Sequence, residues 1–328
     1  MISGKILNIG SLHCTIEYLQ EEPFLSLVDY RNNYFTSNNP NKIIEFYKGF
    51  ENRDQLIQWM RERPKGVANI HEVDGDKDNI VVIPTTDFNG NYARECRENI
   101  FKGLHMVFVE SGGRGDFYFN FAHNCNVGIR KAMEYNPKWI VVSNDDMQKI
   151  DDITVLQREI SNLNHLKLDA VFGCDQNHRP RRGKISKPNY FYNLAQTYYR
   201  KYFSQERKKI RLRFHVVYLP VPLSALVYRN LFTKGLTMFV FRDFLILSAN
   251  FVKNIKCIVF DETYINDSED NDLALRLHVS GKITTINYAI KTIGAKSLGN
   301  SDIRLFRSIA SEIYLNHKWE EFLCLSSP

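Results

Sequence analysis

Trp139-Ile-Val-Val-Ser-Asn-Asp-Asp-Met147 is the stretch that decides the fold. Residues 139–142 are aromatic or β-branched and carry no charge, which is typical of a strand covered on both faces. Asp145 and Asp146 follow where such a strand would end. Ligands of open α/β sheets bind beyond the carboxyl ends of the strands. Two adjacent carboxylates there suit Mg²⁺ or Mn²⁺ carrying a phosphate. A plain polar turn is the alternative, because Asn and Asp are common turn residues.

The chain around this stretch alternates between strands and helices. The apolar residues of the helical segments recur at helical spacing, and the strand segments are short apolar runs. We expect strands at residues 79–84, 105–109, 139–143 and 169–173, and helices at residues 92–103, 119–134 and 153–163. This order predicts an α/β fold with a mostly parallel sheet flanked by helices.

Residues 1–78 look like a separate accessory unit to which no chemistry can be assigned. Short strand-like runs, separated by Gly, Pro or acidic residues, predict a β-containing extension. The expected elements are strands at residues 5–9, 14–19 and 25–30, a helix at residues 52–61 and a polar linker at residues 74–78. At the other end, a helix within residues 303–328 is expected to close the chain.

Composition narrows the class of protein. Of 328 residues, 44% are hydrophobic and 24% are charged, which is ordinary for a globular protein and argues against disorder. The net charge of +6 permits contact with phosphates, nucleotides or an anionic membrane but requires none of them. We expect neither a signal peptide nor a transmembrane helix. Six dispersed cysteines without a C-x-x-C pair favour a reduced, cytoplasmic protein over a zinc site.

Residues 190–213 combine aromatic and basic side chains. The solvated face of a helix is the favoured interpretation, because charge runs usually have that role. A peripheral contact with an anionic membrane surface is the alternative. No nucleic-acid partner is expected.

A second acidic cluster opens an expected helix at residues 268–281. Ser268 can cap this helix, and Glu269, Asp270 and Asp272 complement the dipole of its first turn, which stabilises a helix without any further function. If both acidic clusters line one cleft, one can hold a metal and the other can take a proton. Transfer of a group from a nucleotide-activated donor to a hydroxyl requires this division.

Four stretches together resemble the glycosyltransferases of the GT-A fold, family 2, especially the rhamnosyltransferase-like members. They are Val81-Val-Ile-Pro-Thr-Thr86, Val107-Phe-Val-Glu-Ser-Gly-Gly113, Asn124-Cys-Asn-Val-Gly-Ile129 before the opening stretch, and Phe260-Asp-Glu262 with Glu269-Asp-Asn-Asp-Leu273 and Arg276. The last is the most specific, because its order and its spacing both fit. The match defines a domain at residues 79–302, with a donor half at 79–175 and an acceptor half at 176–302.

The resemblance implies an inverting, metal-dependent hexosyl transfer from a nucleotide-diphosphate sugar to a hydroxyl of a glycan, a lipid-linked acceptor or a protein. It implies that Asp146 binds Mn²⁺ or Mg²⁺ with help from Asp145. It makes Asp270 the catalytic base, with Glu269 as the competing candidate. The implied donor-binding residues are Pro84, Thr85, Thr86, Glu110, Gly112, Asn126 and Asp145.

The chain departs from the family pattern at three places. Glu110 stands where the family usually has Asp, and Asn144 occupies the first place of its D-x-D motif. The histidine that often follows the strand after the second acidic helix is absent, so a third metal ligand is left open. Lys296 in that segment either meets the diphosphate or is a loop lysine with no role.

Two other functions compete with glycosyl transfer. A sugar-nucleotide pyrophosphorylase would need a Gly-rich, basic phosphate loop after the first strand, but residues 85–92 contain one Gly and no Lys or Arg. A non-catalytic module that binds an anionic polymer or membrane would use the basic residues 200–213.

Overall fold

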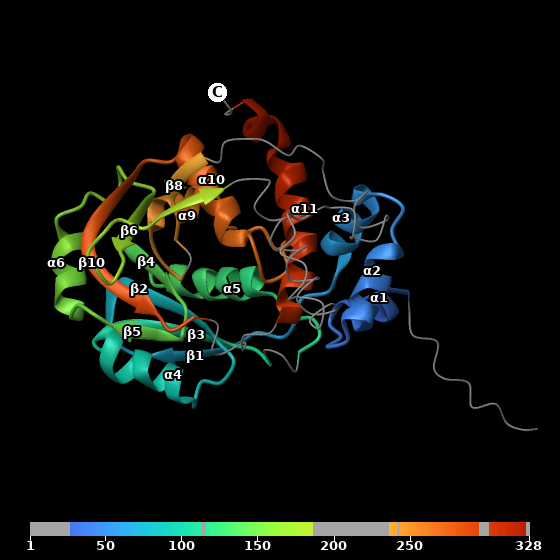
Figure 1. Ribbon diagram of the computed structural model, residues 1–328. Helices are drawn as coiled ribbons and strands as arrows, with labels where there is room; N and C mark the ends of the chain where they lie inside the picture. Colours follow the sequence, from blue (N-terminus) through green and yellow to red (C-terminus); the bar gives the residue numbers. More distant parts are fainter. Residues whose placement is uncertain (1–26, 113–115, 186–235, 242, 295–301, 326–328) are drawn as a thin grey trace, which may run out of the picture.

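The structure is a computed structural model that describes residues 27–112, 116–185, 236–241, 243–294 and 302–325. Within these residues, an eight-stranded sheet carries helices on both faces, and a helical layer stands beside it (Figure 1). A separate two-stranded sheet pairs β7 (Arg182–Ile185) with β8 (Leu236–Phe239). The predicted α/β class is confirmed.

The large sheet is mixed rather than simply parallel. Across the sheet the strands are β1 (Asn69–Val73), β3 (Leu104–Glu110), β2 (Asp76–Thr85), β4 (Trp139–Ser143), β9 (Phe244–Ser248), β6 (Ala170–Cys174), β10 (Ile283–Thr292) and β5 (Met147–Lys149). The pairings show that β3, β2, β4, β6 and β10 run one way and that β1, β9 and β5 run the other way. A strand is expected from the apolar run at residues 244–249, but the prediction of a mostly parallel sheet missed its antiparallel direction and its place between β4 and β6.

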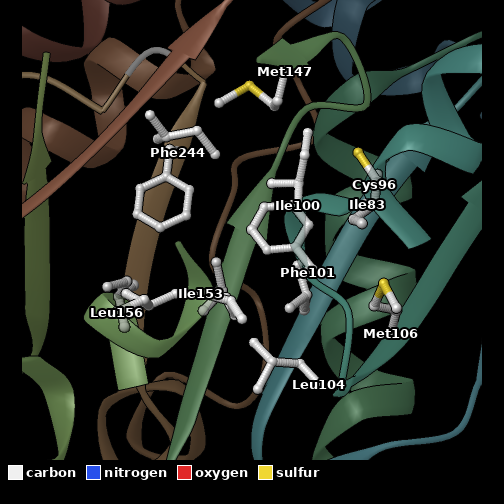
Figure 2. Packing of buried hydrophobic residues seen from close by; sticks show 14 of the residues in the cluster. Ile83, Cys96, Ile100, Phe101, Leu104, Met106, Met147, Ile153, Leu156 and Phe244 are labelled. Carbon is white, nitrogen blue, oxygen red and sulfur yellow. The ribbon is translucent and has the colours of Figure 1, made fainter. Parts of the chain in front are cut away.

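The central strands are buried on both faces, as their uncharged sequences predict. Val81 and Ile83 of β2 point into one core, while Ile80 and Val82 point into the other. The first core lies against α4 (Asn91–Glu95), the π-helical turn η1 (Cys96–Ile100) and α6 (Ile153–Ser161). Figure 2 shows the side chains of η1 and α6 meeting those of the sheet in this layer.

The opposite face of the sheet is covered by three helices. They are α5 (Phe121–Met133), α9 (Ala249–Asn254) and α10 (Glu269–Ser280). Helix α5 lies close to the strands because residue 128 is glycine. A Cβ atom there would lie 2.4 Å from Cγ1 of Val82 and 2.8 Å from Cγ2 of Val109, which is too close for any side chain.

The helical layer has its own core of aromatic side chains. It is built from α1 (Leu27–Phe35), α2 (Pro40–Lys48), α3 (Arg53–Glu62) and α11 (Asp302–Leu325). The ring of Phe46 lies 5.1 Å from that of Phe35 and 4.7 Å from that of Trp59. Ala274 and Leu275 of α10 share this core, so the layer packs directly on α10.

Several predictions for the N-terminal region need correction. A strand was predicted at residues 25–30, but α1 begins at Leu27. The segment predicted as a linker, residues 74–78, overlaps β2, which begins at Asp76. β1 joins the large sheet beside β3. The predicted strands at residues 5–9 and 14–19 lie outside the described residues, as does the basic, aromatic segment 190–213.

Two helices outside the sheet region agree with the predictions. Helix α3 was expected at residues 52–61 and α11 within 303–328, and both are present. None of the helices in the described ranges combines the length and the apolar character that crossing a bilayer would need. Cys96, Cys125, Cys174 and Cys257 are free thiols.

Candidate active site

Asp145 and Asp146 lie at the carboxyl end of β4 and are buried, with 4% and 1% of their surface exposed. The hydroxyl of Thr85, the last residue of β2, donates to Oδ2 of Asp145 at 2.7 Å. The hydroxyl of Thr292, the last residue of β10, donates to Oδ1 of Asp146 at 3.2 Å. The backbone N–H of Ile293 donates to the carbonyl of Asp146 at 2.8 Å. The ends of three strands therefore converge on this pair of carboxylates.

The donor set of this pair fits a magnesium or manganese ion. Carboxylate oxygens are the ligands that these hard cations prefer, and the two threonine hydroxyls orient them. In the part of the chain that the structure describes, no cluster of three or more His, Cys, Asp or Glu side chains could hold a metal. Mg²⁺ commonly binds through one or two carboxylates and completes its shell with water and substrate phosphates. Two carboxylates such as those of Asp145 and Asp146 would therefore be enough protein ligands for Mg²⁺.

Glu110 ends β3 on the other side of β2 and is already engaged by the protein. Its Oε2 lies 2.6 Å from Nε2 of His71, and its Oε1 accepts from the backbone N–H of Phe88 at 3.4 Å. The rings of His71 and Phe88 stack with centroids 4.4 Å apart. The guanidinium of Arg97 lies over the Phe88 ring at 4.3 Å. Sequence reasoning named Glu110 here but missed the other three, since they come from separate elements.

Three further residues predicted to bind the donor lie in or near the end of β2, namely Pro84, Thr86 and Gly112. Pro84 pairs with Val109 of β3. The pairing of β2 with β4 ends at Val82, so β4 needs no backbone N–H from residue 84, and proline is tolerated there. Thr86 follows β2 and is half-buried. Gly112 is exposed, and a Cβ atom there would lie 3.2 Å from Cβ of Asp116.

Asn126, predicted to contact the donor, is fully buried and uses its whole amide within the protein. Its nitrogen donates to the carbonyl of Phe260 at 2.8 Å and to Oε1 of Glu262 at 2.9 Å. Its oxygen accepts from the N–H groups of Val259 and Phe260 at 3.1 and 3.0 Å. These four hydrogen bonds fasten the segment before α10 to α5, and they leave no amide group of Asn126 facing a ligand.

Glu269 and Asp270 begin α10, as predicted, but the cap differs. Ser268 adopts a left-handed backbone with φ of 67° and makes no side-chain cap. Its hydroxyl donates instead to Oε1 of Glu312 at 3.1 Å. Glu269 is 7% exposed, whereas Asp270 is half-exposed. A base that accepts a proton from an incoming hydroxyl must be accessible, which favours Asp270.

The connectivity indicates where the first turn of α10 points. β10 begins three residues after α10 ends, and its first residue, Ile283, pairs with Ala170 at the start of β6. The end of α10 therefore lies at the edge where the parallel strands begin. Helix α10 packs on this face of the sheet through Leu273 and Leu277, so its first turn lies nearer the opposite edge, the edge at which β4 ends.

Helix α11 holds the first turn of α10 through Asp272. This fully buried carboxylate accepts from Nε1 of Trp319 at 2.8 Å, and Nζ of Lys318 lies 3.0 Å from it. Arg276 pairs with the same carboxylate at 3.0 Å. Sequence reasoning assigned no role to Lys318 or Trp319. Their distance of more than forty residues from Asp272 along the chain left no local signal.

A cavity of about 450 Å³ lies beside the carboxylates of β4. Thr292, which donates to Asp146, forms part of its wall. Arg181 of the same wall pairs with Asp243 at 2.8 Å, and the carbonyl of Asp243 accepts from the N–H of Asn144. The cavity also contains the basic side chains of Arg179, Arg182 and Lys291.

No model of a protein family matches the chain, and no curated protein matches it.

Proposed function

We propose that the chain is an inverting glycosyltransferase of the GT-A type that uses a nucleotide-diphosphate sugar. The observation that carries the proposal is the convergence of β2, β4 and β10 on Asp145 and Asp146 at the carboxyl edge of the sheet. Ligands of open α/β sheets bind at that edge. The direction of α10 supports the proposal, because its first turn with the partly exposed Asp270 would then lie towards the same edge.

The sheet gives the proposal a second support. β3, β2 and β4 are parallel neighbours, as in a nucleotide-binding half, and the antiparallel β9 separates them from β6 and β10. The strand ends carrying Thr85, Glu110 and Asp145 then form the donor side. The segments linked to β6 and α10 form the acceptor side.

In the proposed reaction the oxygen of the acceptor hydroxyl attacks the anomeric carbon. Asp270 takes the hydroxyl proton, the bond from carbon to the diphosphate oxygen breaks, and the nucleoside diphosphate leaves with that electron pair. A metal held by Asp145 and Asp146 would supply neutralisation of the diphosphate charge. Because attack and departure occur on opposite faces, the configuration at the anomeric carbon inverts. Glu110 and Thr85 would contact the nucleoside.

Donor binding can be tested before the acceptor is known. The purified chain is screened against UDP, GDP, dTDP and CDP sugars with and without Mn²⁺, and unfolding temperature is measured. The matching donor should raise the unfolding temperature by mass action, more strongly with Mn²⁺. Asp146→Asn should remove the Mn²⁺-dependent part. An unchanged Mn²⁺-dependent shift in this variant would remove the metal assignment.

The base is tested with the matching donor by following release of the nucleoside diphosphate, to water or to added acceptors. Asp270→Asn should keep donor binding but lower turnover by about 10²–10⁴-fold, since general base catalysis has that magnitude. Glu269→Gln is the matched comparison and should lose much less. The reverse pattern would move the base to Glu269, and full turnover in both variants would end the proposed mechanism.

A further inference from the structure

A second pocket lies away from the carboxylates of β4, where the helical layer meets α5 and α10. Its volume is about 570 Å³, within the usual range for small-ligand pockets. It is lined by Arg61, Lys65, Arg130, Ile258, Asp261, Glu262, Thr263, Arg276 and Lys318. The walls thus come from α3 and the loop after it, α5, the segment before α10, α10 itself and α11.

The pocket has a surplus of positive charge. Five basic and two acidic side chains line it. Both acids are already engaged, since Asp261 pairs with Lys318 at 2.7 Å and Glu262 lies 2.8 Å from Nδ1 of His123. Arg276 and Lys318 both pair with the buried Asp272.

Among the described residues, the other three basic side chains of the pocket form no salt bridge. Within the described ranges, no carboxylate lies within 4.0 Å of the charged nitrogens of Arg61, Lys65 or Arg130. The three belong to different segments, so they approach the pocket from different directions. The guanidinium of Arg61 is placed over the ring of Tyr314, with 6.0 Å to its centroid.

Lys65 shows the electrostatic consequence of this arrangement. Burial and the neighbouring Arg63 both lower the pKa of Lys65, and the carboxylates of Glu262 and Asp261 offset this only in part. Its ammonium donates to the carbonyl of Arg63 at 3.0 Å. An anion in the pocket would favour the charged form of Lys65 and would reduce the repulsion among the cations.

We propose that this pocket is a binding site for a small phosphate-bearing anion, separate from the donor site. Guanidinium groups match phosphate oxygens in pairs, and a lysine adds a point charge, so two arginines and a lysine from three directions suit a diphosphate or a phosphate ester. The shared chemistry admits a soluble phosphate compound or the head group of a phosphorylated lipid. The site does not depend on the proposed glycosyl transfer.

Binding is tested with inorganic pyrophosphate in buffer containing EDTA, by titration calorimetry and by unfolding temperature. The native chain should bind saturably. The triple variant Arg61→Gln, Lys65→Gln, Arg130→Gln should bind at least roughly tenfold more weakly, since charge-assisted hydrogen bonds are lost. A control variant with Lys102→Gln, Lys167→Gln and Lys253→Gln removes the same charge from exposed positions that do not line the pocket, and it should bind as the native chain does. Circular dichroism verifies that both variants fold.

The outcomes separate this site from the donor site. Absence of saturable binding to the native chain, or equal binding by the first triple variant, would overturn the proposal. Loss of binding in Asp146→Asn with retention in the triple variant would also overturn it. Flotation with vesicles containing a phosphorylated inositol lipid distinguishes the two sources. Vesicle binding that pyrophosphate displaces indicates the head group, and pyrophosphate binding without vesicle binding indicates a soluble ligand.

Discussion

Glu312 on α11 has a pKa that the folded structure raises well above that of a free glutamate. Burial, followed by the carboxylates of Asp267 and Asp270, raises the pKa of Glu312 to about 8. The hydroxyl of Ser268 donates to it at 3.1 Å and only partly opposes this effect. At neutral pH the side chain therefore carries a proton. Because Glu312 is neutral, it adds no further negative charge next to Asp270 in the first turn of α10.

Glu312→Gln should change how stability depends on pH. A carboxyl whose pKa is raised by folding holds its proton more tightly in the folded state. Its contribution is fully present below the unfolded pKa of about 4.3 and is lost as pH rises towards about 8. The variant lacks this loss. The difference in the free energy of unfolding between Glu312→Gln and the native chain should therefore shift in favour of the variant between pH 5 and pH 8. The shift should be at most about 1.4 kcal/mol per pH unit.

Urea unfolding at several pH values measures this difference. Glu98→Gln, at an exposed position on η1, is the control. A difference between Glu312→Gln and the native chain that stays constant from pH 5 to pH 8 would contradict the protonated state of Glu312.

At this scale the sequence identified the acidic residues but not their partners. The places of Asp145, Asp146 and Asp270 could be predicted, because the first two follow an uncharged strand and the third opens a well-marked helix, while their roles stay predictions. Their surroundings could not, since Thr292 reaches Asp146 across 146 positions of the chain. Asn126 illustrates the opposite error. A polar residue in a motif predicted a ligand contact, while its amide holds two backbone segments together.

Helix α5 is the element whose position the sheet constrains most tightly. Gly128→Ala would place a methyl group 2.4 Å from Cγ1 of Val82 on a rigid, buried strand. We expect a loss of about 1–3 kcal/mol in the free energy of unfolding, although alanine has the better helix propensity. Val82→Ala removes the nearer of the two obstructing atoms, so the double variant should be more stable than the sum of the two single changes predicts. Denaturant unfolding of all four proteins completes this cycle, and simple additivity would refute the steric explanation.

Element types were predictable where the pattern was long or strongly apolar, as for α5, β4 and α10. Strand direction was not. The apolar run of β9 reads like that of any buried strand, because periodicity carries no information on orientation. Residues 25–30 were misassigned because a short apolar run fits a strand as well as a helix, and packing on α2 and α3 decides for the helix. The left-handed turn at Ser268 likewise depends on its partner Glu312, far along the chain.

The helical layer and the sheet share α10, so we expect them to unfold together. Phe46→Ala should remove about 3–5 kcal/mol of stability from the aromatic core of the layer. In a background carrying Trp59→Phe and Trp319→Phe, fluorescence of Trp139 reports on the sheet. With Phe46→Ala, the unfolding midpoint followed by Trp139 fluorescence should fall by the same amount as the midpoint followed by helical circular dichroism. Tyr30→Ala, at a position 48% exposed, is the control. An unchanged Trp139 midpoint would mean that the two parts unfold independently.

The two borders of the large sheet have a consequence for self-association. β1 has five residues with His71 and Glu72 at its centre, and β5 has only three. A short or charged edge strand presents few unpaired backbone N–H and C=O groups with which a second molecule could pair. Neither edge strand therefore offers a good template for pairing with the edge strand of another molecule. This protects a sheet that is rich in valine and isoleucine against amyloid-like growth.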